Sequence, residues 1–397
     1  MSGAEEKEVL LEIKDLSKEF EIRSGKIGGK SQYLHALSNV NLKVYKGETL
    51  GIIGESGCGK STLGRCIVRL HQPTSGEILF EGEPLDYKGA RAKKQRENVQ
   101  MIFQDPYSSL NPRKTCAKII EEPMIIHKTV TDKEERMKRV VDLMKVVGLD
   151  SQHVHRFPHE FSGGQRQRIN IARALTLNPK LIVCDEPVSA LDVSIQAQVL
   201  NLFGRLQREF GLTYVFISHD LSVVRHISDR IAIMYLGQVV ELTAAETVYD
   251  NPLHPYTRAL LSAIPPTSPF EEHAPIVLEG DIPSPIGDLK GCPLASRCPQ
   301  CTERCRCETP ALREVEPGHE VACFTRGNRR ATARVPTGPC GSRRALTGDA
   351  RFAPCVAQPP ARRGIGECTL MTFEGAPCGI AWRAPSSMEE RRAEWSA

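Results

Sequence analysis

A glycine-rich segment around residue 57 carries the strongest chemical pattern in the sequence. Residues 54–62 fit the pattern G-x-x-x-x-G-K-[ST] directly after an apolar run. Glycines let such a loop turn its backbone N–H groups toward phosphate oxygens, where a Cβ would obstruct them. We expect Lys60 to reach two phosphates of a nucleotide, and we expect Ser61 to ligate Mg²⁺. The predicted ligands are Gly54, Glu55, Ser56, Gly57, Cys58, Gly59, Lys60, Ser61 and Thr62.

Two carboxylates, Asp185 and Glu186, end a second apolar run, which starts at Leu181. Unpaired buried charge is costly, so a buried strand that ends in acids predicts partners for them. Asp185 is suited to hold Mg²⁺ through water, and Glu186 is placed to orient and deprotonate an attacking water. The alternative, a solvated acidic turn, is less favoured once the phosphate loop is considered.

Fourteen cysteines are spread unevenly, and six of them fall between Cys292 and Cys323. In a chain without a leader, metal ligation or free thiols explain such a group better than disulfides do. Cys58 is a separate case, because Lys60 and a helix N-terminus beside it could lower its pKa and give a reactive thiol. We favour the alternative that Cys58 is a small residue tolerated in the loop.

The elements that must position these residues alternate along the chain. Residues 8–23 and 40–44 alternate apolar and polar side chains, which predicts half-buried strands, and 24–30 reads as a loop. Residues 50–53 read as a buried strand, and 131–150 carry apolar residues at helical spacing. This alternation to about residue 245 predicts an α/β fold with a mostly parallel sheet covered by helices.

Charge divides the 397-residue chain into a body and a tail. The formal net charge of +4 combines 40 basic and 42 acidic residues through Cys323 with 12 Arg and 6 acids in residues 324–397. The positive charge therefore comes from the tail and gives no reason to expect a nucleic-acid partner. Apolar runs fall short of the ~20 residues that a spanning helix needs. The N-terminus lacks a signal-peptide pattern, so we expect a cytosolic protein.

Further motifs resemble those of ABC-type ATPases over residues 8–245. Residues 161–168 are similar to the family's signature motif, with Phe161 where Leu is usual. Residues 189–192 resemble the D-loop, 217–220 the switch-histidine motif and 103–106 the Q-loop. The resemblance implies a P-loop NTPase core with a β subdomain and a helical subdomain at about 105–178.

The resemblance also implies roles for individual residues. His219 would hydrogen-bond the γ-phosphate and the water bound to Glu186, and Gln104 would bind Mg²⁺ and that water. Phe20 would stack on adenine, and Tyr33 is the second candidate for this role. The alternative for both residues is ordinary packing within a strand. The residues expected to meet the nucleotide of a second subunit, in a head-to-tail dimer, are Ser162, Gly163, Gly164 and Gln165 of the signature. The D-loop residue is Asp192.

Three segments narrow the resemblance to the ATPase subunits of oligopeptide/dipeptide/nickel importers. They are residues 104–113, 157–160 and 252–261. His254, in the last of these, is expected to shape a Pro-fixed docking turn rather than to bind a metal.

The family's C-terminal cysteine pattern also matches. The matching residues are Cys292, Cys298, Cys305 and Cys323, with gaps of five, six and seventeen residues. By resemblance they hold a [4Fe–4S] cluster, with Zn²⁺ or free thiols as the alternatives. This chain adds Cys301 and Cys307, which could compete as ligands.

These observations predict an ATP-binding domain in residues 1–250, a small Cys-rich C-terminal module in 251–325, and a disordered tail in 326–397. The expected function is ATP hydrolysis that drives an importer, with ATP and Mg²⁺ bound and with di- or oligopeptides as cargo. Nickel or another small solute is the alternative cargo. A soluble ABC ATPase, or a module that binds ATP without hydrolysing it, are the rival classes.

The expected partners are a paralogous or identical ATPase subunit, two transmembrane permease subunits and, indirectly, a solute-binding protein. The expected location is the cytoplasmic face of the cell membrane.

Overall fold

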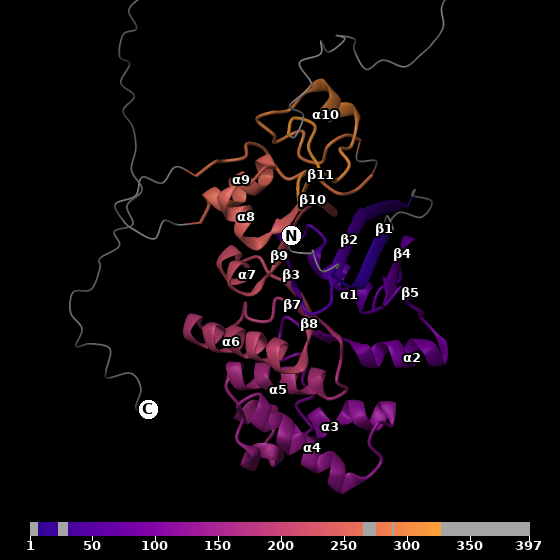
Figure 1. Cartoon of the computed structure of the whole chain (residues 1–397), viewed down its shortest axis with the longest axis vertical. Coiled ribbons are helices and arrows are strands. Elements are labelled where there is room, and N and C mark those ends of the chain that lie inside the picture. Colours follow the sequence, from indigo (N-terminus) through magenta and orange to yellow (C-terminus); the bar gives the residue numbers. More distant parts are fainter. Residues whose placement is uncertain (1–6, 23–30, 265–274, 288–289, 327–397) are drawn as a thin grey trace, which may run out of the picture. The chain divides into compact units, whose positions relative to one another are not determined.

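Strands of the chain form two sheets in the computed structural model, which describes residues 7–22, 31–264, 275–287 and 290–326 (Figure 1). The larger sheet has the order β11-β12-β10-β9-β3-β8-β7-β6. Its strands are β3 Thr49–Ile53, β6 Val99–Ile102, β7 Leu181–Asp185, β8 Thr213–Ile217, β9 Arg230–Tyr235, β10 Gln238–Ala244, β11 Arg313–Glu316 and β12 His319–Val321. The smaller, antiparallel sheet has the order β2-β1-β4-β5 and comprises β1 Val9–Ile22, β2 Gln32–Tyr45, β4 Ser75–Phe80 and β5 Glu83–Pro84.

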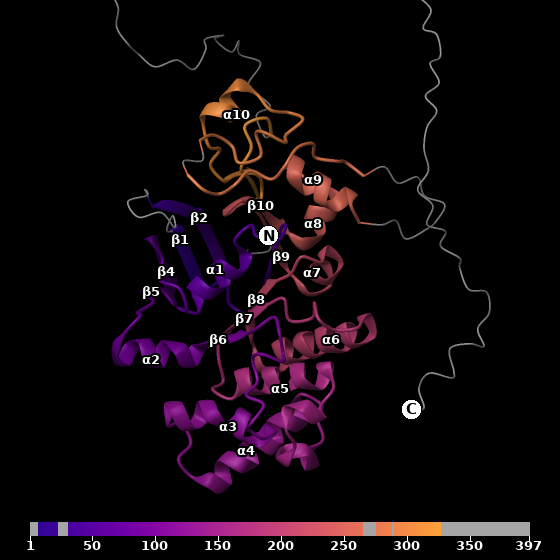
Figure 2. The same cartoon turned by 180° about the vertical axis from the view of Figure 1, so that it is seen from behind.

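Several helices come directly after strands of the larger sheet along the chain. They are α1 Lys60–Ile67, α2 Gly89–Asn98, α3 Cys116–His127, α4 Lys133–Val146, α5 Gly163–Leu175, α6 Val193–Phe210, α7 Leu221–Ile227, α8 Ala245–Asp250, α9 Pro255–Ser262 and α10 Glu303–Cys307. Two short 3₁₀ helices span Ser151–His155 and Pro158–Glu160. Helices α3, α4 and α5 pack on one another, as Figures 1 and 2 show from opposite sides.

The centre of the larger sheet is parallel, as the sequence predicts. Strands β9, β3, β8, β7 and β6 pair in parallel, whereas β10, β12 and β11 continue the sheet in antiparallel pairs. Alternate residues of β7 enter different cores: Ile182 and Cys184 pack with the helices α3–α6, and Leu181 and Val183 pack with α1 and the smaller sheet. Burial on both faces explains why these strands read as continuous apolar runs.

Most of the predicted local structure is confirmed. The strand predicted at 8–23 is β1, and the one predicted at 50–53 is β3, whose residues are all buried. The helix predicted within 131–150 is α4, which begins at Lys133 because the carboxylate of the preceding residue, Asp132, caps it by accepting a hydrogen bond from the N–H of Glu135. The loop predicted at 24–30 lies outside the described residues, as does the predicted tail beyond Arg326.

The C-terminal region extends the larger sheet. Strand β12 pairs with β10 through Glu241 and Val321, and β11 pairs with β12. The junction is fixed by His319, whose Nε2 lies 2.7 Å from Oε1 of the fully buried Glu241. The sequence pattern did not indicate this continuation, since a three-residue strand leaves almost no periodicity. Across the part of the chain that the structure describes, no helix is long and apolar enough to cross a membrane.

Candidate active site

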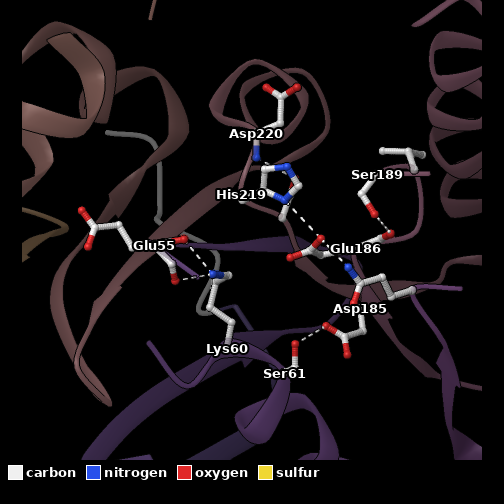
Figure 3. A network of polar contacts seen from close by, with 12 residues as sticks. Glu55, Lys60, Ser61, Asp185, Glu186, Ser189, His219 and Asp220 are labelled. Atoms are coloured by element: carbon white, nitrogen blue, oxygen red, sulfur yellow. Dashed lines mark hydrogen bonds and ion pairs between the residues drawn. The ribbon is translucent and has the colours of Figure 1, made fainter. Parts of the chain in front are cut away.

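The glycine-rich loop joins the buried strand β3 to α1, as predicted. Gly54 and Gly59 have positive φ angles, and a Cβ on either would lie 2.2 Å from the carbonyl oxygen of Met234 or 2.4 Å from that of Ala36. Lys60 reaches back across the loop, where its ammonium donates to the carbonyl oxygens of Gly54 at 2.6 Å and Glu55 at 2.9 Å (Figure 3). The loop thus holds a buried cation and turns around it.

Ser61 and Asp185 meet across the gap between α1 and the end of β7. The Ser61 hydroxyl donates to Oδ1 of Asp185 over 2.7 Å, and Asp185 is buried. Burial raises the pKa of the Asp185 carboxyl, although the Ser61 hydrogen bond opposes that shift. A hydroxyl and a carboxylate held together are hard oxygen donors, which is the ligand type that Mg²⁺ prefers, so the two residues fit the predicted magnesium ion.

Glu186, the residue after β7, is contacted by two predicted catalytic side chains. Its Oε2 accepts a hydrogen bond from Nε2 of Gln104 at 2.9 Å and lies 3.1 Å from Nδ1 of His219 (Figure 3). Its backbone has a φ of +46°, a conformation that non-glycine residues rarely adopt. Such strain persists where the surrounding structure holds a functional side chain in one orientation.

A cavity of about 280 Å³ opens in front of these groups. Its lining combines the phosphate loop and catalytic residues with apolar and small residues from other segments. The lining residues are Phe20, Leu34, His35, Ala36, Ser56, Gly57, Gly59, Lys60, Ser61, Thr62, Gln104, Glu186, Leu236, Gly237 and Pro285.

The predicted nucleotide-binding and catalytic residues, taken together, therefore fall into two groups. Nine of them line the cavity, including Phe20, whereas the fallback Tyr33 does not and is 48% exposed. Asp185 and His219 do not line the cavity but contact residues that do: Asp185 accepts a hydrogen bond from Ser61, and His219 lies next to Glu186. Gly54, Glu55 and Cys58 also lie off the lining: Gly54 and Glu55 offer their carbonyl oxygens to Lys60, and Cys58 is buried.

The idea that Cys58 has a lowered pKa is wrong. Its side chain packs in the core with α1, and burial raises the pKa of the thiol, although Lys60 at 3.8 Å pulls it down. The alternative, a small residue that fits the loop, agrees with this environment.

The signature residues lie apart from this cavity. Ser162 caps α5 by accepting from the N–H of Gln165, and the Gln165 side chain accepts in turn from the N–H of Ser162. Gly164 is needed for packing, since a Cβ there would lie 2.4 Å from Cγ2 of Ile195. Asp192 is exposed at the start of α6. The N-terminus of α5 is thus capped by its own signature residues, and Ser162 is exposed there.

Sequence reasoning missed contacts that reach this site from beyond residue 250. The Tyr256 hydroxyl accepts a hydrogen bond from the Glu55 N–H, and Arg297 lies 3.6 Å from the Glu55 carboxylate. Pro285 lines the cavity itself. No sequence pattern could have found these contacts, because each depends on how the C-terminal region folds back on the loop.

The four predicted cysteine ligands converge on one small cavity. Cys292, Cys298, Cys305 and Cys323 line it, and neither Cys301 nor Cys307 does. Thiols suit a soft metal. The cavity nevertheless measures only about 10 Å³, and no group of three or more His, Cys, Asp or Glu side chains among the described residues is arranged as a metal site. The four thiols are therefore gathered at one point without being in coordination geometry, and ATP hydrolysis at the nucleotide site needs no metal at these cysteines.

His254 forms the predicted Pro-fixed turn. Its Nδ1 accepts a hydrogen bond from the N–H of Tyr256 and so caps α9, and its own N–H donates to Glu241. Burial lowers the pKa of His254 to about 4, so the imidazole is neutral at pH 7. Its nitrogen is used within the fold, which argues for a structural role rather than metal ligation.

Two family models match the sequence. The ABC transporter model matches residues 37–189, and the model of the oligopeptide/dipeptide transporter C-terminal region matches residues 240–305. The chain is 54% identical over 324 residues to the oligopeptide transport ATP-binding protein AppF of Bacillus subtilis (strain 168), covering 81% of this chain and 98% of that protein. It is 52% identical over 325 residues to the oligopeptide transport ATP-binding protein OppF of Escherichia coli (strain K12), covering 81% and 97%.

Solved structures agree with these matches. The structure of cbiO1 from Clostridium perfringens, part of the ABC transporter complex cbiONQ, has a TM-score of 0.53 and 28% identity over 62% of this chain and 92% of that one. A dimeric, post-hydrolysis ATP-binding cassette bound to ADP and Pi has a TM-score of 0.52 and 32% identity, over 59% and 99%.

Proposed function

The chain belongs to the ABC transporter family of ATP-binding proteins with an oligopeptide/dipeptide transporter C-terminal region, and from this membership we propose that it hydrolyses ATP to drive import of di- or oligopeptides. One observation carries the catalytic part of the proposal. The Glu186 carboxylate is held between Gln104 and His219 at the cavity that the phosphate loop lines. This arrangement supports Glu186 as a base that acts beside the terminal phosphate of a bound ATP.

ATP binding begins at the phosphate loop. Lys60 exchanges its two loop carbonyls for the β- and γ-phosphates, and the loop N–H groups and the N-terminus of α1 add favourable dipoles. Ser61 and Asp185, with the Gln104 amide oxygen, would hold Mg²⁺, which neutralises charge on the phosphates when bound. Phe20 would stack on the adenine.

Hydrolysis needs a positioned water. Glu186 takes a proton from the water as its oxygen bonds to the γ-phosphorus, and the bond from that phosphorus to the β–γ bridging oxygen breaks, giving ADP and phosphate. His219 and Gln104 orient the water and the phosphate through hydrogen bonds. Charge on the leaving oxygen is stabilised by Lys60.

The proposed partners follow from the position of the signature residues, which lie outside the cavity lining. The signature residues Ser162–Gln165, of which Ser162 is exposed, would contact the ATP of a second, paralogous or identical subunit in a head-to-tail dimer, with Asp192 at the same interface. A dimeric cassette is known among the similar structures. We propose that two permease subunits bind this dimer at the cytoplasmic face of the membrane and that a solute-binding protein delivers the cargo to them.

Glu186→Gln tests the catalytic part. We expect the variant to bind ATP with unchanged affinity and to lose at least about 100-fold in turnover, because the general base is removed while the shape is kept. Glu246→Gln on α8 is a matched control that should retain full turnover. Wild-type turnover in Glu186→Gln would contradict the role of Glu186 as the base. A wild-type protein that binds ATP without hydrolysing it would instead indicate the rival class, a module that only binds ATP.

Co-purification and stimulation test the transport part. Membrane extracts in detergent should yield the chain together with two permeases, and the complex in vesicles should hydrolyse ATP faster with binding protein and trialanine. Stimulation by nickel rather than by trialanine would redirect the cargo. A chain that copurifies with no membrane protein would favour the soluble class.

We also propose that Cys292, Cys298, Cys305 and Cys323 bind a [4Fe–4S] cluster, with Zn²⁺ as the alternative, within a module at 251–325 that follows an ATP-binding domain at 1–250. Their convergence on one cavity supports this ligand set over Cys301 and Cys307. Anaerobically purified protein should carry iron, sulfide and visible absorbance, and Cys305→Ser should lose them while Cys307→Ser keeps them. Colourless protein with one zinc per chain would establish the alternative.

A further inference from the structure

We propose that Pro285, in the C-terminal region, forms part of the wall that receives the adenine base, so that the C-terminal region helps to set the affinity for ATP. The inference rests on the proposed function, since it concerns the same cavity. It adds a specificity-determining residue from outside the segment that carries the nucleotide motifs.

Residues 285–287 are bound to the edge of β2. The N–H of His35 donates to the carbonyl oxygen of Pro285 over 2.9 Å, and the N–H of Gly287 donates to that of Tyr33 over 3.3 Å. Between them, Leu34 and Ile286 form an antiparallel β-bridge. This is a short strand addition, which fixes the position of Pro285 by backbone bonds rather than by loose contact.

The cavity is lined by two chemically different sets of residues. One set is the phosphate loop with Lys60 and Ser61, together with Gln104 and Glu186. The remaining lining includes Phe20, Leu34 and Pro285. Purine bases bind flat apolar and aromatic surfaces, so this second set suits a base.

The segment that carries Pro285 is also held farther upstream. The N–H of Ile276 donates to the Ser262 hydroxyl at the end of α9 over 2.8 Å, and the Leu278 carbonyl oxygen accepts from Arg297 at 3.5 Å. The position of the wall therefore depends on α9 and on the Cys-rich segment.

Side-chain burial does not explain why this segment lies on β2. Ile276, Val277, Ile282 and Ile286 are all more than a third exposed, so the segment contributes little to the core. Pro285, in contrast, is partly buried in the cavity lining. The proline ring fixes the backbone φ angle, so the residue loses little conformational entropy on binding and offers a preorganised contact surface.

Pro285→Gly tests the proposal, with Pro283→Gly as the matched control, because Pro283 lies on the same segment but outside the cavity lining. Equilibrium binding is measured for two probes in Mg²⁺, ATP and inorganic tripolyphosphate, which lacks the base. We expect Pro285→Gly to weaken ATP binding about threefold to tenfold, a loss typical of a removed apolar contact, and to leave tripolyphosphate binding unchanged. Pro283→Gly should change neither.

The tripolyphosphate arm also reports whether the variant is folded. Unchanged ATP affinity in Pro285→Gly would overturn the proposal, and equal weakening of both probes would overturn it by showing that Pro285 acts through the phosphate loop. Wild-type protein that binds neither probe would instead refute the proposed function.

Discussion

The hydroxyl of Tyr256 accepts a hydrogen bond from the backbone N–H of Glu55 over 2.9 Å. Tyr256 lies on α9 and is fully buried, and burial raises the pKa of its phenol, which stays neutral at pH 7. Glu55 is the second residue of the phosphate loop, and its carboxylate lies 3.6 Å from Arg297. The loop is thus supported by residues from two parts of the C-terminal region.

Tyr256→Phe should loosen this support without opening a cavity. The Glu55 N–H loses its acceptor, which costs about 1 kcal/mol, and the less ordered loop should bind ATP more weakly. Urea unfolding and the KM for ATP measure the two effects. Tyr214→Phe is the control, because its equally buried hydroxyl makes only a 3.5 Å bond to Phe203; an equal KM change in both variants would show that the loop contact is irrelevant.

Asp185→Asn should separate stability from activity. Burial raises the pKa of Asp185, so its charge at pH 7 destabilises the fold when Mg²⁺ is absent. The amide keeps an acceptor for Ser61 and removes that charge. We expect a urea midpoint in EDTA at or above that of the wild type, with ATP turnover reduced at least about 100-fold. Asp132→Asn, which still caps α4, should alter neither the midpoint nor the turnover. A midpoint for Asp185→Asn below that of the wild type would contradict the idea that the buried Asp185 charge destabilises the fold.

His219→Ala should act on turnover alone. The His219 side chain is 58% exposed and contacts Glu186, so its removal costs little stability but leaves the water and phosphate less well oriented. We expect turnover to fall at least about 100-fold, with an unchanged unfolding midpoint. His226→Ala, on the exposed part of α7, is the control. Turnover within twofold of the wild type in His219→Ala would mean that Glu186 needs no partner there.

The sequence was sufficient for the ABC ATPase fold because its strongest patterns are local. The apolar runs of β3 and β7 are buried on both faces, and residues that the chemistry needs come soon after each: Lys60 and Ser61 follow β3 after the glycine-rich loop, and Glu186 follows β7 directly. Because these residues lie close in sequence to the ends of two buried strands, the strands fix where they lie. Their position at one edge of the sheet could therefore be predicted from the sequence.

Long-range contacts left no such pattern. The strand β12 has three residues, and the contacts of Pro285 with β2 run through backbone atoms, which carry no sequence signature. The less favoured idea of a reactive Cys58 was wrong for a related reason. Proximity to Lys60 in sequence suggested a stabilised thiolate, whereas the fold buries the sulfur and the desolvation cost outweighs the nearby charge.

Acid should destabilise the junction between the core and the C-terminal region through His254. Burial lowers the pKa of this imidazole from 6.5 to about 4, against the attraction of Glu241. Between these two values the unfolded chain binds a proton that the folded chain excludes. The stabilisation is therefore present above pH 6.5 and is lost as the pH falls toward 4, with a loss of about 2 kcal/mol between pH 7 and 5.

His254→Asn isolates this contribution, because asparagine can also cap α9 but does not titrate. Urea unfolding at pH 7 and pH 5 should show a drop in wild-type stability that exceeds the drop in His254→Asn by about 2 kcal/mol. Glu241 does not mimic this effect. Burial pushes its pKa up, but hydrogen bonds with His319 and from the backbone N–H groups of Leu253 and His254 hold it below 4.5, so its own loss begins at more acidic pH. His226→Asn, at an exposed site, should retain the wild-type drop, and equal drops in wild type and His254→Asn would show that His254 titrates normally in the folded chain.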